Sequence, residues 1–216
     1  MDKRILIIGT GGHAVSVANI AIAANYKIEG FIEERKSVST FLTFPVMNNF
    51  DCLKQKKDFA IFVAIGDNSI REKVVNQLQV HFNNIYFPSL IHPSAVVGHF
   101  SNIGQGSVIM PNSTVGPNST VGDFCILNTS CSIDHDSQMG NFSSIAPGVV
   151  TGGSVKIGCG SAICIGAKIK HGVSIGKNCV IGANSYLNRS TEEGGLYYGT
   201  PAKLIRARLK SDPYLE

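Results

Sequence analysis

The sequence predicts an N-terminal α/β domain of the βαβ type, followed by a parallel β-helix of six-residue repeats. An aliphatic residue or Met recurs at every sixth position, with Thr151 as the single exception: Ile91, Val97, Ile103, Ile109, Val115, Val121, Leu127, Ile133, Met139, Ile145, Thr151, Ile157, Ile163, Ile169, Ile175, Ile181 and Leu187. The residue two positions before each of them is Ser, Ala, Cys or Val. A strict period of six is typical of parallel β-helices, in which each coil adds one layer to a buried stack.

The α/β domain is predicted by apolar runs that alternate with helix-like stretches up to about residue 90. The expected elements are strands at 4–8, 28–32, 59–65 and 85–90 and helices at 14–24 and 69–80, with a polar, Ser/Thr-rich stretch after the second strand. The turn Gly9-Thr10-Gly11-Gly12-His13-Ala14 has the G-x-G-x-x-A spacing that holds phosphate at a helix N terminus. Because four strands are only half of a dinucleotide fold, we favour a mononucleotide, such as the UDP of a sugar nucleotide, over NAD and a dehydrogenase.

The corners of the β-helix follow from a second period. The residue after each aliphatic is mostly Gly, but every third repeat has Met110, Asn128, Ala146 or Cys164 instead, so three repeats make one triangular coil. Glycine at two corners of three is expected for a backbone conformation that a Cβ disfavours.

The main departure from this rule lies after Ile133, where Asp134-His135-Asp136 replaces the expected Gly. A departure from a regular local pattern is where a functional site is expected. Neighbouring carboxylates raise the pKa of a His and make it a stronger base, which suits proton removal from an attacking amine or hydroxyl. A polar loop without a chemical role is the alternative.

The remaining His and Cys residues favour structural roles. His99 and His171 each lie 36 residues from His135 on the same face, roughly 9–10 Å apart at the strand spacing, which is too far for one metal ion. We therefore expect no metal, with a metal shared between subunits as the alternative. Cys125, Cys131 and Cys179 fall on inward positions, so thiols are favoured over disulfides or a zinc site, as in a reducing compartment.

Composition excludes several classes of protein. The net charge is only +4, and no basic tract with interleaved aromatic residues indicates nucleic acid. No apolar run reaches the about 18 residues of a membrane span, and the N terminus is not a signal peptide, so we expect a cytoplasmic protein without a membrane partner. Residues 188–199 are expected to be a polar loop, and the basic tail 203–208 either a solvated cap or a holder of coenzyme phosphates.

The chain resembles the bacterial sugar O- and N-acyltransferases of the sialic-acid O-acetyltransferase type, and among them the UDP-4-amino-sugar N-acetyltransferases of bacillosamine and related glycan pathways. The motifs that carry the resemblance span nearly the whole chain: Gly9-Thr10-Gly11-Gly12-His13, Ala64-Ile65-Gly66-Asp67-Asn68 with Arg71, Ile126-Leu127-Asn128-Thr129-Ser130, Ile133-Asp134-His135-Asp136, Val155-Lys156-Ile157-Gly158 and Gly199-Thr200-Pro201-Ala202-Lys203.

The resemblance implies a Rossmann-like nucleotide-sugar-binding domain over residues 1–90, a left-handed β-helix acyltransferase domain over 91–187, and a C-terminal loop and basic cap over 188–216. It also implies direct transfer of an acetyl group from acetyl-CoA to the 4-amino group of a UDP-linked amino-dideoxy sugar. The expected assembly is a homotrimer with active sites between adjacent β-helices.

By the same resemblance, His135 is the catalytic base, Asp136 raises its basicity, and a backbone N–H of the 152–153 turn stabilises the oxyanion. The expected UDP-binding residues are Gly11, Gly12, His13, Glu33, Glu34 and Asp67, with Asn128 near the sugar. Coenzyme A is expected beside Ser144, Gly153, Ile165 and Gly166. O-acetylation of a sialic-acid-like sugar and a non-catalytic β-helix binding module are the alternative functions.

Overall fold

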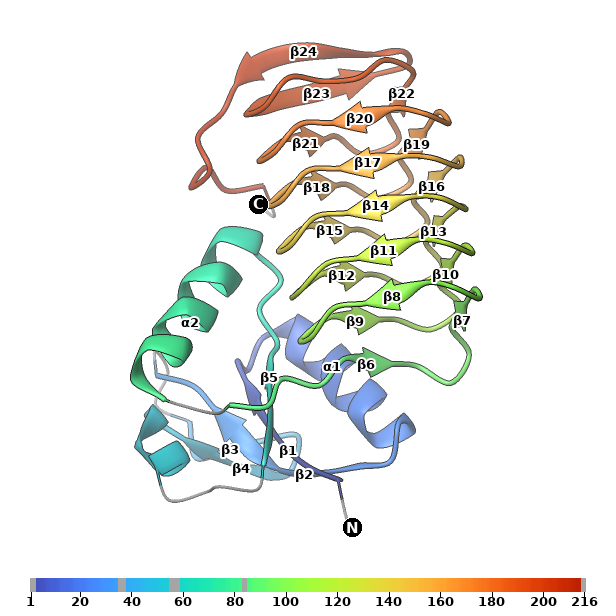
Figure 1. Ribbon diagram of the computed structural model, residues 1–216. Helices are drawn as coiled ribbons and strands as arrows, with labels where there is room; N and C mark the ends of the chain where they lie inside the picture. Colours follow the sequence, from blue (N-terminus) through green and yellow to red (C-terminus); the bar gives the residue numbers. More distant parts are fainter. Residues whose placement is uncertain (1–2, 35–37, 55–58, 83–84, 215–216) are drawn as a thin grey trace.

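The computed structural model describes residues 3–34, 38–54, 59–82 and 85–214. Figure 1 shows an α/β domain at the N-terminal end and a stack of β-coils that rises from it and ends in a hairpin. None of the helices in these ranges is long and apolar enough to cross a lipid bilayer.

The βαβ unit expected around the Gly-rich turn is present in a five-stranded sheet of order β3-β4-β2-β1-β5. The elements are β1 (Lys3–Ile8), α1 (Gly12–Ala23), β2 (Tyr26–Ile32), β3 (Thr40–Phe41), β4 (Phe44–Met47), the 3-10 helix η1 (Phe50–Lys54), β5 (Ala60–Val63) and α2 (Asn68–His81). Strand β1 is parallel to both β2 and β5, which flank it. Its carboxyl end is therefore the point where the strand order reverses, and ligands of open α/β sheets bind at such points.

Three features of this domain differ from expectation. Helix α1 begins at Gly12 instead of Ala14, because Gly11 has an extended backbone and serves as its N-cap. The Ser/Thr-rich stretch after β2 carries the β3–β4 hairpin and η1. The strand expected at 85–90 is reduced to a bridge between Tyr86 and Ala60, although residues 83–84 lie outside the described ranges.

Each six-residue repeat forms a strand of two residues. These strands are β6 (Leu90–Ile91), β7 (Val96–Val97), β8 (Asn102–Ile103), β9 (Val108–Ile109), β10 (Thr114–Val115), β11 (Thr120–Val121), β12 (Ile126–Leu127), β13 (Ser132–Ile133), β14 (Gln138–Met139), β15 (Ser144–Ile145), β16 (Val150–Thr151), β17 (Lys156–Ile157), β18 (Ala162–Ile163), β19 (Lys168–Ile169), β20 (Ser174–Ile175), β21 (Val180–Ile181) and β22 (Tyr186–Leu187). They form three sheets, which we call the first face (β6, β9, β12, β15, β18, β21), the second face (β7, β10, β13, β16, β19, β22) and the third face (β8, β11, β14, β17, β20). This confirms the predicted left-handed β-helix.

The repeat explains the core of the β-helix. The aliphatic positions pack into one buried cluster, and the thiols of Cys125, Cys131 and Cys179 are free and buried at inward positions, as predicted. The small inward residues also join coils: the Ser107 hydroxyl donates to Gly122 O at 2.8 Å and accepts the Cys125 N–H at 2.8 Å. A small polar side chain is therefore satisfied inside the stack.

The corner glycines are needed for a different reason from the one expected. The φ angles of Gly98, Gly116 and Gly152 are not in the left-handed region, but a Cβ on them would lie 2.6, 2.5 and 2.8 Å from a backbone nitrogen of the next coil. The left-handed residues come two positions later, for example Asn118 and Asp136, both with φ 56°. Close approach of successive coils, and not backbone conformation, therefore selects glycine at these corners.

The C-terminal part is more ordered than expected. Strand β23 (Gly195–Gly199) pairs in parallel with β21, and β24 (Ala202–Ala207) returns antiparallel to it, so the hairpin extends the first face. The prediction of a polar loop over residues 188–199 is therefore wrong for residues 195–199, which form β23, and most of the basic tail 203–208 forms β24.

The α/β domain packs against the first coils, and Arg71 of α2 holds the two parts together. Its side chain is 1% exposed. The guanidinium donates to the carbonyl oxygens of Phe124 at 2.9 Å and Phe142 at 3.2 Å in the β-helix, to Ile65 O at 2.9 Å, and to Asn68 Oδ1 at 2.7 Å. One buried side chain thus fixes the α/β domain against the corner between the third and first faces.

Candidate active site

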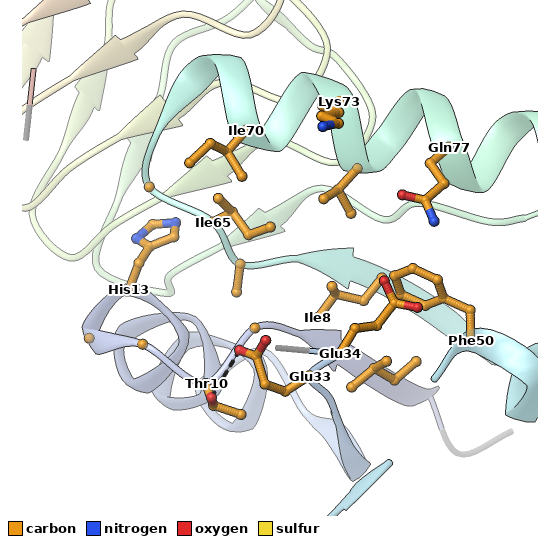
Figure 2. Close-up of a pocket in the computed structure, with 17 residues that line it drawn as sticks. Ile8, Thr10, His13, Glu33, Glu34, Phe50, Ile65, Ile70, Lys73 and Gln77 are labelled. Atoms are coloured by element: carbon orange, nitrogen blue, oxygen red, sulfur yellow. Dashed lines mark hydrogen bonds between the residues drawn. The ribbon is translucent and has the colours of Figure 1, made fainter. Parts of the chain in front are cut away.

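A cavity of about 480 Å³ lies at the carboxyl ends of β1, β2 and β5, beside the N terminus of α1 (Figure 2). Five predicted substrate-binding residues line it: Gly11, Gly12, His13, Glu33 and Glu34. The first N–H groups of α1 have no partner within the helix, so this end attracts an anion. The Thr10 hydroxyl donates to Glu33 Oε2 at 3.1 Å and orients that carboxylate. The cavity therefore combines an anion site with acceptors for hydroxyl groups, which suits a nucleotide.

A second cavity, of about 370 Å³, lies against the first face of the β-helix. The predicted residues Asn128, Ser144 and Ile165 line it, and the rest of its β-helical wall is apolar: Ile126, Ile145, Ala146, Ala162, Ile163, Cys164 and Ala183. His13 and Gly66 line both cavities, so the two meet there. A long ligand can extend from the nucleotide-type cavity into the apolar one.

His13 is the polar group at this junction. The residue keeps some exposure, but its Nε2 is buried and has no hydrogen-bond partner among the described residues. Burial, followed by the positive charge of Arg71, lowers the pKa of His13 to about 4, so the ring is neutral at pH 7. A neutral ring with a free buried nitrogen can form one hydrogen bond to a ligand.

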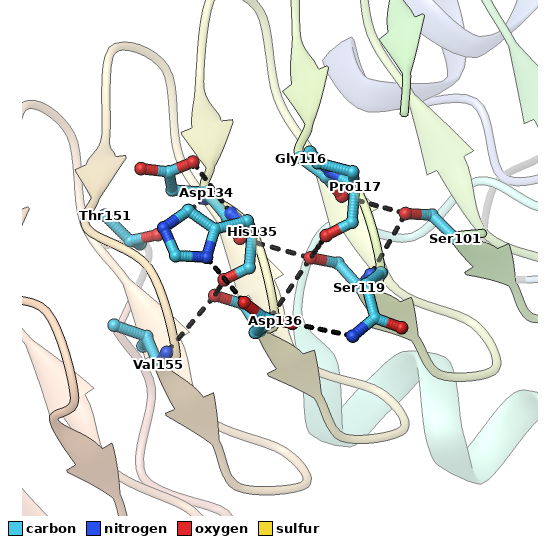
Figure 3. Close-up of polar contacts among 11 residues, drawn as sticks. Ser101, Gly116, Pro117, Ser119, Asp134, His135, Asp136, Thr151 and Val155 are labelled. Carbon is cyan, nitrogen blue, oxygen red and sulfur yellow. Dashed lines mark hydrogen bonds and ion pairs between the residues drawn. The ribbon is translucent and has the colours of Figure 1, made fainter. Parts of the chain in front are cut away.

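His135 projects from the corner between the second and third faces, in the turn from β13 to β14 (Figure 3). Its Nδ1 lies 2.6 Å from Asp136 Oδ2, and Asp136 Oδ1 accepts from Asn118 Nδ2 at 2.6 Å. The hydrogen bond to Asp136, and then the charge of Asp134, raise the pKa of His135, while the same bond lowers the pKa of Asp136. Because Nδ1–H donates to the carboxylate, Nε2 is left as the proton acceptor.

Two departures from the repeat, Asp134 and Thr151, contact each other. Asp134 N–H donates to Thr151 Oγ1 at 3.2 Å, whereas the equivalent N–H of Gly116 donates to the backbone oxygen of Ile133 at 2.8 Å. The pairing of β13 with β16 is correspondingly shortened. Asp134 Oδ1 in turn accepts the His135 N–H at 2.7 Å. Together Asp134 and Thr151 shape the turn that presents His135.

Gly153 lies directly beside the His135 ring, since a Cβ on it would lie 2.5 Å from both Cε1 and Nε2 of the ring. Gly152 N–H donates to Ile169 O at 2.9 Å, whereas none of the hydrogen bonds of the described residues uses Gly153 N–H. In the 152–153 turn, the free donor next to the ring is therefore Gly153.

The structure does not bring all predicted residues together within one chain. His135 and Gly153 lie at the corner between the second and third faces and line neither cavity. Gly166, with φ +68°, also lines neither cavity, although its neighbour Ile165 lines the second. Asp67 caps α2, where its Oδ1 accepts the N–H groups of Ser69 at 2.9 Å and Ile70 at 3.0 Å. Its role in holding UDP stays a prediction.

Sequence reasoning missed Lys73, Asn118 and Tyr214. Lys73 lines the first cavity and Tyr214 the second. Asn118 had a usable signal, because it lies 18 residues, one coil, before Asp136. No group of three His, Cys, Asp or Glu side chains in the described ranges is arranged to hold a metal ion.

The chain matches two family descriptions: the PglD N-terminal domain over residues 4–78, and the bacterial transferase hexapeptide (six repeats) over residues 154–189. It is similar to the acetyltransferase domain of PglB from Neisseria gonorrhoeae in complex with acetyl coenzyme A, with 32% identity, a TM-score of 0.88, and coverage of 95% of this chain and 100% of that chain. It is also similar to PerB from Caulobacter crescentus in complex with CoA and GDP-perosamine, with 29% identity, a TM-score of 0.87, and coverage of 94% and 97%. WeeI from Acinetobacter baumannii, at 24% identity and a TM-score of 0.86 over 93% of this chain and 99% of that one, shares the fold.

Proposed function

This chain belongs to the hexapeptide-repeat sugar acetyltransferase family, and from that premise we propose that it transfers the acetyl group of acetyl-CoA to the 4-amino group of a UDP-linked amino-dideoxy sugar in glycan biosynthesis. The single observation that carries the proposal is the 2.6 Å contact between His135 Nδ1 and Asp136, which leaves an exposed Nε2 as a general base. The relatives PglB and PerB bind acetyl coenzyme A, and CoA with GDP-perosamine, respectively.

In this proposal each part of the chain holds one portion of the substrates. The domain of residues 1–90 takes the nucleotide in the first cavity, with the pyrophosphate at the N terminus of α1 and the ribose near Glu33 and Glu34. The β-helix of residues 91–187 takes the acyl donor beside Ser144 and Ile165 in the second cavity. The sugar lies between them, near Asn128. The contact of the two cavities at His13 and Gly66 supports this order.

The chemistry is a direct transfer. His135 Nε2 removes a proton as the amine nitrogen bonds to the thioester carbonyl carbon, and the negative charge that develops on the carbonyl oxygen is met by Gly153 N–H. The C–S bond then breaks, and the coenzyme thiolate leaves with the proton that His135 returns. Asp136 keeps the ring in the tautomer with a free Nε2 and stabilises the imidazolium.

We propose further that the active site is completed between subunits of a homotrimer. His135 stands on the corner opposite the first face, whereas the second cavity lies against that face, so one chain does not place the base against its own donor cavity. The second face presents the apolar side chains of Val96, Val150 and Tyr186, which are 59, 48 and 37% exposed. Packing that face against a neighbour would bury apolar surface and bring His135 to the neighbour's cavities.

The test is turnover by the purified protein with acetyl-CoA and a panel of UDP- and GDP-linked 4-amino sugars, followed by thiol release and mass spectrometry of the product. We expect N-acetylation of a UDP-linked member, and a fall in kcat of about 10²–10⁴-fold for His135→Ala. Acetylation of only hydroxyl acceptors would redirect the assignment to O-acetylation. No turnover with any acceptor would leave a binding module. An unchanged kcat in His135→Ala would remove the base.

A further inference from the structure

The residues after β24 fold back and form part of the wall of the second cavity. Tyr214 lines this cavity together with Gly66 and Ser144. Its hydroxyl donates to Gly66 O at 3.3 Å, accepts the Asn68 N–H at 3.0 Å, and lies 3.5 Å from Ser144 Oγ. One side chain near the C terminus thus contacts both the α/β domain and β15.

A set of charged contacts holds this segment, residues 208–214, which we call the C-terminal strap. The Arg208 guanidinium donates to Asn178 O at 2.7 Å and to Asp212 O at 2.6 Å, and it lies 6.0 Å from the centre of the Tyr214 ring. The Asp212 carboxylate forms an ion pair with Arg206 at 3.0 Å. The strap is therefore anchored to the β-helix and to β24, and Tyr214 is presented by a fixed segment.

The second cavity has few polar atoms, and the strap contributes one of them. Apart from Asn128, Ser144 and Tyr198 of β23, the wall formed by the β-helix and its hairpin is apolar, so a ligand with amide groups finds few partners there. A phenol oxygen has two lone pairs and one proton. The proton goes to Gly66 O and one lone pair accepts the Asn68 N–H, which leaves a second lone pair. Ser144 Oγ, at 3.5 Å, is the polar atom of the β-helix beside it.

We propose that the C-terminal strap is part of the acyl-donor site and that Tyr214 is a donor-binding residue, which accepts an N–H of the amide-containing arm of the donor beside Ser144. This inference rests on the proposed function only for the identity of the donor. Residues 208–214 then have a role in binding the donor and none in the proton transfer. A change in the strap is therefore expected to alter donor affinity and not the acidic limb of the pH profile.

The test compares Tyr214→Phe, which removes only the hydroxyl, with Asp212→Asn, which loosens the strap without touching the cavity. Tyr86→Phe, remote from both cavities, is the matched control. We expect the Kd for coenzyme A, measured by calorimetry on the full chain, and the KM for acetyl-CoA to rise by about 2- to 12-fold in Tyr214→Phe. Asp212→Asn shifts both in the same direction. The kcat and the KM for the nucleotide sugar of Tyr214→Phe stay near those of the unmodified protein. Its melting temperature falls by a few degrees, because the Asn68 N–H loses its acceptor.

Coenzyme A affinity in Tyr214→Phe equal to that of Tyr86→Phe would overturn the role of the strap while leaving the proposed acetyl transfer intact. Weakened coenzyme A binding in Tyr214→Phe, together with no turnover of any amino sugar by the unmodified protein, would support the strap and reject the proposed acceptor. Failure of the unmodified protein to bind coenzyme A would overturn both.

Discussion

Replacing Gly153 with Ala perturbs the proposed catalytic corner, at His135, by a single methyl group. Its φ angle lies outside the left-handed region, so the backbone tolerates Ala, but the new Cβ would lie 2.5 Å from Nε2 and Cε1 of His135. Because ordinary contacts begin at 3.4 Å, the ring must withdraw by about 0.9 Å. Because Nδ1 belongs to the same ring, the shift also changes the 2.6 Å hydrogen bond to Asp136. A misplacement of about 1 Å at a reacting group costs roughly 10²-fold in rate, or about 2.7 kcal/mol in the barrier.

The assay is steady-state acetylation across a pH series. We expect kcat to fall by about 10²-fold in Gly153→Ala, with the KM for the nucleotide sugar and the melting temperature nearly unchanged. Gly172→Ala is the control at the same corner, one coil further on: its Cβ meets nothing within 4 Å, but its φ of +69° makes Ala strained. It should lose about 1 kcal/mol of stability and keep its kcat. A Gly153→Ala enzyme with kcat within about threefold of the unmodified protein would refute the placement of the ring as the base.

Three further variants test the surrounding structure. Asp136→Asn removes the main cause of the raised His135 pKa, so the acidic limb of kcat, where activity is lost as His135 becomes protonated, should move to lower pH; an unmoved limb would mean that another group titrates. Thr151→Val leaves the Asp134 N–H without its acceptor and should lower the free energy of unfolding by about 1–3 kcal/mol in urea titrations, whereas no change would make that contact dispensable. Arg71→Met leaves several buried acceptors unpaired and should lower the free energy of unfolding by roughly 3 kcal/mol or more. The control Arg189→Met, at an exposed position, should change it by no more than about 0.5 kcal/mol. Equal effects of the two variants would show that Arg71 does not join the α/β domain to the β-helix.

The β-helix could be predicted residue by residue because its period is set by geometry that the sequence must repeat in every coil. Ile, Val and Leu recur at the inward position of each strand. A shift of the repeat by one residue would direct the aliphatic side chains of a coil to solvent. The reason for the corner glycines could not be read in this way. Gly116 needs space and not an unusual φ, because its Cβ would lie 2.5 Å from the backbone nitrogen of His135, and no local pattern in the sequence gives the distance to the next coil.

Local elements without a period were the weaker part of the prediction. The strands of the β3–β4 hairpin are too short to show a hydrophobic pattern. The sequence of β24 looks like a basic tail, because what makes it a strand is its hydrogen bonding to β23, which its own residues do not indicate. The candidate site was predicted in pieces. Glu33 and His13 follow from a local motif, but Tyr214 reaches Ser144 across 70 residues of chain, and no spacing in the sequence indicates that contact.

Thr151 and Asp134 show what a broken repeat can indicate. Taken alone, a Thr at one inward position, where the other sixteen are aliphatic or Met, is a minor irregularity. An Asp in place of Gly alone would only crowd the corner. The Asp134 N–H donates to the Thr151 hydroxyl, so each departure accommodates the other. The turn that carries His135 therefore differs from the equivalent turns of other coils both at Asp134 and at its partner Thr151. Gly153, on the next coil, then leaves room for the ring. A position that departs from the repeat therefore has meaning when a second departure lies one coil away and contacts it. By that criterion the corner at residues 134–136 is set apart from the solvated turns at His99 and His171.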